Sequence, residues 1–186
     1  MSETPKNKGF IFEIYDLMNM ICYSSIIVFV LAILFFRPVQ VTGISMEPTF
    51  QDADKILIRG FLYKPKHSDV VVVDTTNSGL QHSHVIKRVI ACAGDTIDLD
   101  PITGEVSVNG ELLDEPYISD TINMWSFGDF TYPLTVEEGK IFVMGDNRND
   151  SLDSRFAKIG QVDERYVNGK VIFRYFPFNN MGSNFK

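Results

Sequence analysis

The sequence predicts one membrane-spanning helix near the N-terminus followed by a single, mainly β domain. Residues 17–36 read LMNMICYSSIIVFVLAILFF and carry no charged side chain. Residues 38–186 contain many short runs of Val, Ile and aromatic residues, which Gly, Pro, Asn and Asp interrupt. Such runs are typical of short strands joined by turns, in a barrel-like domain or a pair of packed sheets.

The apolar segment is long enough to cross a bilayer. A helix of this length spans about 30 Å, which matches the hydrocarbon core. Asp16 and Arg37 bracket the segment, and Pro38 helps to end the helix. A cleavable signal peptide needs small residues after the apolar run, whereas FFRPVQ follows here. A buried core helix would be shorter and apolar on one face only. We therefore expect an uncleaved anchor.

The charges that flank the anchor bias its orientation only slightly. Lys6 and Lys8 precede the span and Arg37 follows it. The positive-inside tendency predicts a short cytoplasmic tail at residues 1–16 and a transmembrane helix at residues 17–36. Residues 38–186 then form an extracytoplasmic domain that is large enough for one core.

Six stretches of the domain predict strands. Asn109-Gly110, inside one of them, is a strong signal for a tight hairpin turn. Helical periodicity is best near residues 161–167. The predicted strands are 55–63, 69–74, 83–92, 104–113, 140–146 and 169–178.

Charge and cysteine content exclude several classes of protein. The net charge of −7 over 186 residues disfavours nucleic acid as a partner, because an acidic chain repels phosphate backbones. Cys22 lies in the apolar run and Cys92 in the domain, so the two cannot pair. Free thiols are expected.

A first group of candidate residues lies in VTGISMEPTF, residues 41–50. Gly43 permits backbone conformations closed to other residues, and Pro48 fixes the chain after Ser45. A segment held in this way can direct a hydroxyl and its own N–H at one substrate atom. An ordinary turn with an exposed serine is the alternative.

A second group lies in SHVIKRVIACAGD, residues 83–95. On a strand, Lys87 shares a face with Val85, Val89 and Ala91, whereas Arg88 points the other way with Ile86 and Ile90. Lys87 either extends its ammonium to water or is kept neutral by burial. A neutral lysine can take the proton of a serine hydroxyl. Lowering its pKa from about 10.4 to about 7 requires a bias of roughly 4–5 kcal/mol.

A third group lies in MGDNRNDSLDSRFAKIG, residues 144–160, directly behind an apolar strand. Its composition alone fits a solvated loop. Its serine, aspartate and arginine side chains can equally orient a base and brace a site through ion pairs.

Taken in order, these groups resemble the sequence motifs of bacterial type I signal peptidases. Ser45-Met46-Glu47-Pro48-Thr49 matches S-M-x-P-T, the run from Lys87 to Asp95 matches K-R-V-I…G-D, and the run from Gly145 to Arg155 matches G-D-N-R-x-x-S-x-D-S-R. The resemblance extends from the anchor to about Phe178. It is closest to the compact form common in Gram-positive bacteria and implies a β-rich catalytic domain of signal-peptidase type.

The resemblance implies a role for each matching residue. Ser45 is the nucleophile and supplies one oxyanion donor through its N–H. Lys87 is the general base and later protonates the leaving amine. Ser151 orients the Lys87 amine. Ion pairs among Arg88, Asp146, Asp153 and Arg155 brace the site.

Some family members have a serine two residues before the nucleophile as a second oxyanion donor. Gly43 occupies that position here, so this donor is either absent or supplied by the glycine backbone. The family cleaves after small residues at positions −1 and −3, and Val41, Met46 and Ile86 are candidates for the pockets that receive them.

The implied partners are the signal peptides of preproteins, the lipid bilayer and the protein secretion machinery, with no cofactor and no metal. The aromatic stretch 124–134 suits an interface contact or a core. His82 and His84 share a strand face but lack an evident third metal ligand. The rival hypothesis is a membrane-anchored binding or assembly factor, for pili or surface proteins, with an idle peptidase site.

Overall fold

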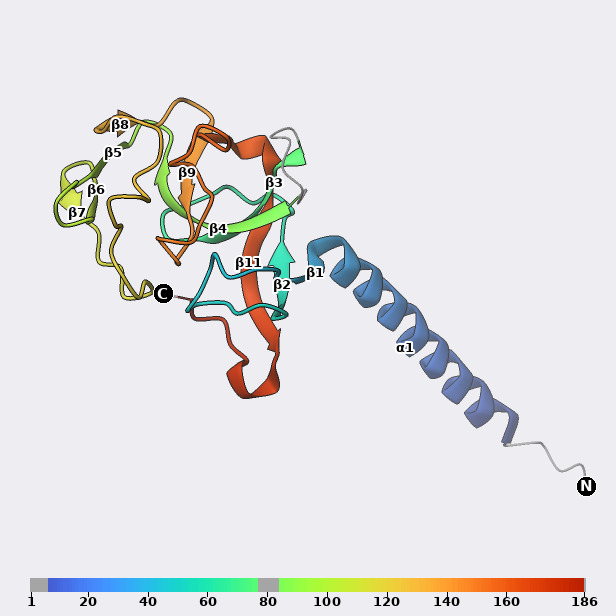
Figure 1. Ribbon diagram of the computed structural model, residues 1–186. Coiled ribbons are helices and arrows are strands. Elements are labelled where there is room, and N and C mark those ends of the chain that lie inside the picture. The colour runs from blue at the N-terminus through green and yellow to red at the C-terminus, as the bar shows by residue number, and fades with distance from the viewer. Residues whose placement is uncertain (1–6, 77–83, 186) are drawn as a thin grey trace, which may run out of the picture. The chain divides into compact units, whose positions relative to one another are not determined.

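The computed structural model describes residues 7–76 and 84–185. The chain divides into two compact units, residues 1–36 and residues 37–186 (Figure 1). His82, considered above as a metal ligand, lies outside the described residues.

The first unit is the helix α1, Asn7–Phe35. Its span from Gly9 to Ile33 has a mean hydropathy of 1.9 in its most apolar window, and none of that window is buried. The helix begins ten residues before the predicted start at Leu17, so Glu13 and Asp16 lie within it. The predicted tail is therefore partly helical, because no residue in the stretch FIFEIY interrupts helical hydrogen bonding. Near the predicted end the chain becomes extended, as residues preceding a proline tend to be.

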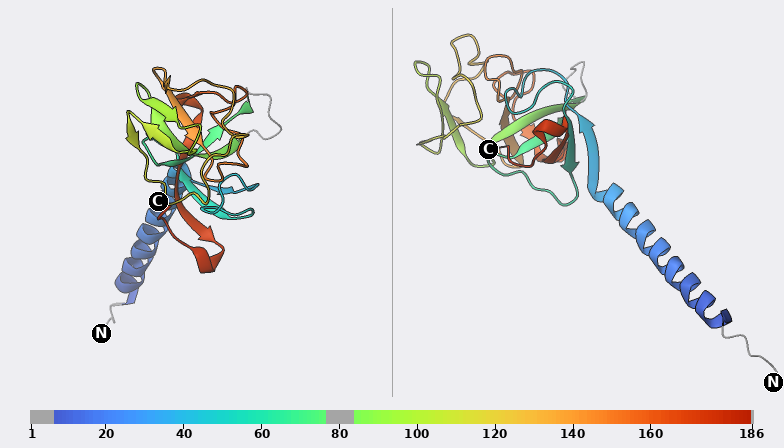
Figure 2. Two further views of the ribbon diagram at one scale, coloured as in Figure 1. Left: turned by 60° about the vertical axis from the view of Figure 1, so that its left-hand side comes forward. Right: turned by 90° about the horizontal axis from the view of Figure 1, so that it is seen from below.

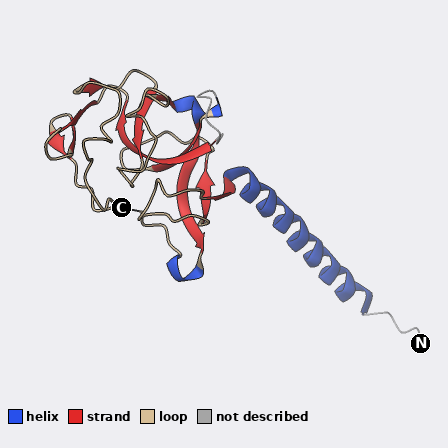
Figure 3. Cartoon of the chain, viewed as in Figure 1, coloured by secondary structure: helices blue, strands red, loops and turns tan. Residues whose placement is uncertain are grey.

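The second unit is mainly β, as predicted, and consists of two sheets (Figures 2 and 3). The larger sheet has seven strands in the order β1-β2-β11-β3-β4-β9-β10 and curls around its own core. Its strands are β1 (Phe36–Gln40), β2 (Lys55–Arg59), β3 (Val70–Asp74), β4 (His84–Cys92), β9 (Lys140–Met144), β10 (Val162–Asp163) and β11 (Val167–Phe176).

The smaller sheet has four strands in the order β7-β6-β5-β8. Its strands are β5 (Thr96–Leu99), β6 (Val106–Val108), β7 (Glu111–Leu112) and β8 (Leu134–Thr135). Asn109 and Gly110 join β6 to β7 with positive φ angles of 55° and 82°, which confirms the predicted tight hairpin.

Each predicted strand region contains a strand, but some boundaries differ. The region 55–63 ends as a strand at Arg59. The stretch 161–167 is β10 followed by a single 3-10 turn, η2 (Glu164–Tyr166), rather than an α-helix. A second such turn, η3 (Phe178–Asn180), follows β11. Strands β1, β5, β8 and β10 were not predicted. β5, β8 and β10 are only 4, 2 and 2 residues long, and β1 directly follows the apolar span and begins at Phe36, which was assigned to the helix.

One of the core clusters positions the candidate site. Val41, Met46 and Phe50 are at most 2% exposed and anchor the chain that follows β1. Their partners are buried residues of β2, β3 and β11, namely Ile56, Ile58, Val70, Val72 and Val171. The segment that carries Ser45 therefore lies on the larger sheet.

Candidate active site

Ser45 is held at the surface of this core by backbone hydrogen bonds. The Val41 N–H donates to the Asp54 carbonyl (2.8 Å), and the Phe50 N–H donates to the Met46 carbonyl (2.8 Å). Because Met46 is buried, its neighbour Ser45 is fixed in position while its side chain stays partly exposed. A hydroxyl held in this way can reach a substrate.

Lys87 lies against this hydroxyl from the neighbouring strand β4. Its Nζ is 2.6 Å from Ser45 Oγ, and the residue is only 3% exposed. Burial lowers the pKa of the Lys87 amine from its ordinary value of 10.5 to about 8, with Asp153 and Asp146 raising it and Arg155 lowering it further. At that pKa roughly one tenth of the molecules hold a neutral amine at pH 7.

The expected alternation along β4 holds only over its first half. Val85 and Val89 pack in one core cluster, but Ala91 belongs to a different cluster, together with Ile90. The pairing of β4 with β9 shifts by one residue between Val89 and Ala91. This bulge ends the face that Lys87 was predicted to share with Ala91, because an extra residue reverses the side-chain direction.

Arg88 connects β4 to the loop that follows β9. Its Nε and Nη2 donate to the two carboxylate oxygens of Asp146 at 2.8 and 2.6 Å. The Thr49 hydroxyl donates to the same carboxylate at 2.5 Å. Strand β4, the serine segment and the loop are thereby joined at one buried ion pair. Thr49 lies within the predicted motif, but we assigned it no role from sequence.

Residues 145–155, which we name the support loop, contain a second buried ion pair. Arg155 donates from Nε and Nη2 to Asp153 at 2.8 and 2.9 Å, and both residues are 0% exposed. Burial raises the pKa of the Asp153 carboxyl, but hydrogen bonds from Arg155 and its charge outweigh burial and hold that pKa below its ordinary value. Asp153 therefore stays ionised beside the lysine.

The structure differs from the expected contact of Ser151. Its hydroxyl donates to Asp153 Oδ2 at 2.7 Å, and within the described residues it forms no hydrogen bond with Lys87. The carboxylate is the stronger acceptor because it is ionised. The residue still lies at the site, since a Cβ on Gly145 would collide with both Ser151 Oγ and the Ser45 carbonyl. Gly145 is a site residue that the sequence analysis overlooked.

The Gly43 backbone does not supply a free oxyanion donor in this structure. Gly43 has φ +89°, and its N–H donates to Asp52 Oδ1 at 2.8 Å. Of the two alternatives drawn from sequence, this contact favours absence of the second donor. The Ser45 N–H, by contrast, makes no hydrogen bond within the described part of the chain, so it is available to a substrate oxygen.

A groove of about 840 Å³ runs beside Ser45 and Lys87. Val41, Met46 and Ile86, the residues predicted for substrate pockets, all line it. Strand β4 pairs with β3 along its first half, whereas its pairing with β9 begins only at Arg88. Residues 85–87 thus have one edge without a strand partner in the described chain. An extended peptide can add to such an edge.

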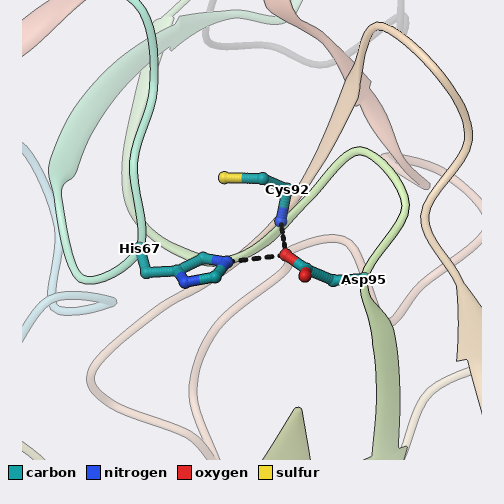
Figure 4. Close-up of side chains that lie close together, drawn as sticks. All are labelled: His67, Cys92 and Asp95. Atoms are coloured by element: carbon teal, nitrogen blue, oxygen red, sulfur yellow. Dashed lines mark hydrogen bonds and ion pairs between the residues drawn. The ribbon is translucent and has the colours of Figure 1, made fainter. Parts of the chain in front are cut away.

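A separate cluster away from the groove contains residue types that bind metals. His67, Cys92 and Asp95 bring their ligand atoms within 4.8 Å of one another. Figure 4 shows the His67 ring and the Cys92 N–H directed at one oxygen of Asp95, at 2.6 and 2.7 Å. The other oxygen accepts from Asn109 at 2.7 Å. These bonds satisfy the carboxylate and stabilise the turn after β4. The cysteines Cys22 and Cys92 are free, as predicted.

Comparison with known proteins places these motifs in one family. The family model described as signal peptidase, peptidase S26, matches residues 14–176. Signal peptidase I of Bacillus licheniformis is 33% identical over 182 residues, which cover 91% of this chain and 92% of that protein. Signal peptidase IB of Staphylococcus aureus is 30% identical over 190 residues, covering 93% and 95%. A crystal structure of a signal peptidase I from Enterococcus faecalis is 31% identical and covers 58% of this chain and 97% of its own, with a TM-score of 0.47.

Proposed function

The chain belongs to the signal peptidase family, peptidase S26, and on that premise we propose that it is a membrane-anchored Ser/Lys endopeptidase that removes signal peptides from exported preproteins. The observation that carries the proposal is the contact of 2.6 Å between Lys87 Nζ and Ser45 Oγ. Burial of the amine makes that contact useful, because a charged ammonium cannot accept a proton.

In the proposed mechanism, neutral Lys87 takes the proton of Ser45 as Oγ attacks the scissile carbonyl carbon. The Ser45 N–H donates to the oxyanion that forms. Lys87 then gives its proton to the leaving amine, and an acyl ester remains on Ser45. A water molecule that Lys87 deprotonates hydrolyses this ester and restores the serine.

The groove supports a substrate that lies extended beside β4. Main-chain hydrogen bonds to residues 85–87 would fix its register, and alternate side chains would enter the groove. We propose that Val41, Met46 and Ile86 form shallow apolar pockets there. Such pockets accept small residues and exclude larger ones, which accounts for cleavage after small residues at positions −1 and −3.

Six further residues support the reaction in this proposal without contacting the substrate, namely Gly43, Arg88, Asp146, Ser151, Asp153 and Arg155. Gly43 shapes the serine segment through its positive φ angle. Ser151 acts on Lys87 through Asp153, whose charge raises the pKa of the lysine. The arginines hold the carboxylates in place.

We further propose that α1 anchors the enzyme in the membrane, with the N-terminal tail in the cytoplasm and residues 37–186 outside it. Preproteins delivered by the secretion machinery would then meet the groove on the outer face. Digestion of the large domain by protease added to intact spheroplasts tests this topology, and protection of the domain would contradict it.

Contact of the domain with lipid has a specific candidate. Met124 and Trp125 are 73% and 85% exposed, whereas Phe127 packs against a core cluster. Trp favours the depth of the headgroups. Trp125→Ala should weaken cleavage of a preprotein in liposomes and leave cleavage of a soluble peptide in detergent unchanged. Equal loss in both assays contradicts lipid contact.

The central test compares the full chain with its Ser45→Ala, Lys87→Ala and Lys87→Arg variants on a preprotein in detergent. Each substitution should lower kcat by about a thousandfold or more. Lys87→Arg tests whether the residue acts as a base or only as a positive charge, because arginine keeps the charge but cannot act as a base. Lys64→Ala, which removes an exposed lysine outside the groove, is the matched control and should stay active.

The pH dependence gives an independent readout. Because the base must be neutral, kcat/KM should rise with pH through a midpoint of about 8. Full activity of Ser45→Ala or Lys87→Ala rules out the mechanism. Absence of cleavage by the wild type would instead favour the rival hypothesis of an assembly factor with an idle site, which has no observation of its own in this structure.

A further inference from the structure

The segment between β7 and β8, residues 113–133, has no regular strand, yet it is tied closely to the support loop. We name it the strap. Hydrogen bonds connect strap residues 121–129 to Asn149 and Arg155 of the support loop. They join the Asn123 N–H to Asn149 Oδ1 (2.9 Å), Asn149 Nδ2 to the Thr121 carbonyl (3.1 Å), Arg155 Nη1 to the Ser126 carbonyl (2.7 Å), and the Asp129 N–H to the Arg155 carbonyl (2.9 Å).

The first half of the strap makes a buried contact with the start of the support loop. Both carboxylate oxygens of Glu115 accept from the Arg148 guanidinium, which has Nη1 at 2.7 Å. The exposed fractions of the two side chains are 6% and 1%. Arg148 Nε in turn donates to the Gly145 carbonyl at 3.1 Å. Glu115 thus holds the arginine that fixes the backbone where the support loop passes Ser45.

Tyr117 makes a second contact, with the other buried arginine of the site. Its ring lies 3.7 Å from Cζ of Arg88, and its hydroxyl donates to Glu115 Oε1 at 2.9 Å. The edge of the Arg88 guanidinium bonds Asp146 and the Ser68 carbonyl. Asp146 therefore fixes the plane of this guanidinium, and Tyr117 covers one face of it. Arg88 is the immediate neighbour of Lys87.

We propose that Glu115 and Tyr117 are positioning residues for the Ser45–Lys87 pair. Glu115 acts through Arg148 on the support loop, and Tyr117 acts through Arg88 on strand β4. Neither residue contacts the groove. The proposal rests on the proposed function, in which Lys87 is the base. Both positioning residues lie in the strap, outside the three sequence motifs.

The contacts of Glu115 and Tyr117 keep the Lys87 amine fixed in position and away from water. Without the Glu115 carboxylate, the buried Arg148 guanidinium has no charged partner. Water then enters to solvate this charge, or the support loop moves to expose it. Either change hydrates the neighbouring site. Less desolvation raises the pKa of Lys87 from about 8 toward 10.5. The neutral base then appears only at higher pH.

The test measures kcat, KM and their pH dependence for the full chain carrying Glu115→Gln. We expect kcat to fall by about 10- to 100-fold, the range typical of residues that orient a site through a neighbour. We expect KM to change by less than about twofold, because the groove is untouched. The rising limb of the pH profile should move to higher pH.

Matched variants separate positioning from general damage. Glu137→Gln removes the same charge from an exposed pair with Lys140 and should leave all three readouts at wild-type values. Tyr117→Phe keeps the ring over Arg88, whereas Tyr117→Leu removes it. Phe should retain most of the activity, and Leu should show the lower kcat and the shifted pH limb.

Two results would overturn the proposal. One is a pH limb at the wild-type midpoint in both Glu115→Gln and Tyr117→Leu. The other is a loss of activity that matches the unfolded fraction of each variant in a thermal melt. Failure of the proposed function would give a different result. In that case Lys87→Ala would stay active, whatever the activity of Glu115→Gln and Tyr117→Leu.

Discussion

Three ion pairs beside the groove differ sharply from two exposed ion pairs elsewhere in the domain. Arg88–Asp146, Arg148–Glu115 and Arg155–Asp153 have side chains that are at most 6% exposed. In the pair Arg165–Asp163 the arginine is 83% exposed, and in Lys140–Glu137 the glutamate is 65% exposed. Burying two charges is expensive and rarely stabilises a fold more than apolar packing does. The buried pairs are therefore better explained by the geometry they impose.

The same comparison explains how Lys87 differs from the buried arginines among the described residues. An arginine cannot lose its proton in a protein, so each buried arginine needs a carboxylate. Lys87 is buried as deeply, but within the described residues its hydrogen-bond partner is Ser45 and no carboxylate lies in salt-bridge range. Burial without a paired charge lowers its pKa. The arginines are thus fixed supports, whereas the lysine is free to exchange a proton.

The largest effect should come from breaking a buried pair. Asp153→Ala leaves Arg155 buried without its carboxylate and should lower the free energy of unfolding by about 3–5 kcal/mol. Arg165→Ala breaks the exposed pair with Asp163 and keeps the Asp163 cap on the backbone N–H of residue 165, so it should leave the urea midpoint unchanged within error. Urea unfolding in mild detergent measures both. Equal effects of the two substitutions on the free energy of unfolding would show that the buried and the exposed ion pairs do not differ.

The next effect should come from the close packing that the buried pairs enforce. Gly145→Ala places a Cβ against Ser151 Oγ and the Ser45 carbonyl, so the support loop must move away from the nucleophile. We expect kcat to fall by about 10²–10³-fold, as small displacements of reacting groups commonly cause. Gly182→Ala, where an added Cβ meets nothing within 4 Å, is the control. A fully active Gly145→Ala enzyme would mean that the loop does not fix Ser45.

A smaller effect, of opposite sign, should follow from removing the buried amine. The pKa of Lys87 is lower in the folded chain, about 8, than its ordinary value of 10.5. The unfolded chain binds the proton more tightly, so the stability of the wild type rises with pH between these two values. Lys87→Met should be more stable than wild type by about 3 kcal/mol at pH 7, though inactive. The advantage should shrink as pH approaches 10.5. If the difference in the free energy of unfolding between Lys87→Met and the wild type does not vary with pH, the Lys87 amine is solvated.

Sequence was sufficient for the parts of the molecule that repeat a pattern. The strands β3, β4, β9 and β11 were predicted because each has enough Val, Ile and aromatic residues to establish a pattern. The two-residue strands β8 and β10 are too short to show one. The start of α1 was misplaced because apolar content locates a span, whereas helical hydrogen bonding continues beyond it.

The candidate site divides in the same way. Ser45, Lys87 and the support loop lie in motifs and were named from sequence. Glu115 and Tyr117 lie in the strap, where nothing in the sequence around them indicates a buried ion pair or a ring stacked on an arginine. Their contacts join residues far apart in the chain, as the pair Glu115–Arg148 shows with a separation of 33 residues. The hydrogen bond from Ser151 to Asp153, two residues away, was not predicted, because the motif does not show which acceptor its hydroxyl selects.

The smallest expected effect concerns a buried polar group that, unlike the paired arginines, has no hydrogen-bond partner among the described residues. Tyr132 packs its ring edge-on against Phe142, with centroids 6.5 Å apart, and among the described residues its buried hydroxyl has no hydrogen-bond partner. Burial raises the pKa of this phenol above its ordinary value, so the group is neutral at physiological pH. Tyr132→Phe keeps the ring and removes the unsatisfied hydroxyl. It should leave kcat unchanged and raise the free energy of unfolding by up to about 1 kcal/mol. A destabilised variant would show that the hydroxyl bonds an internal water beside Arg155 and Asp153, and would extend the buried polar network to this strand-flanking loop.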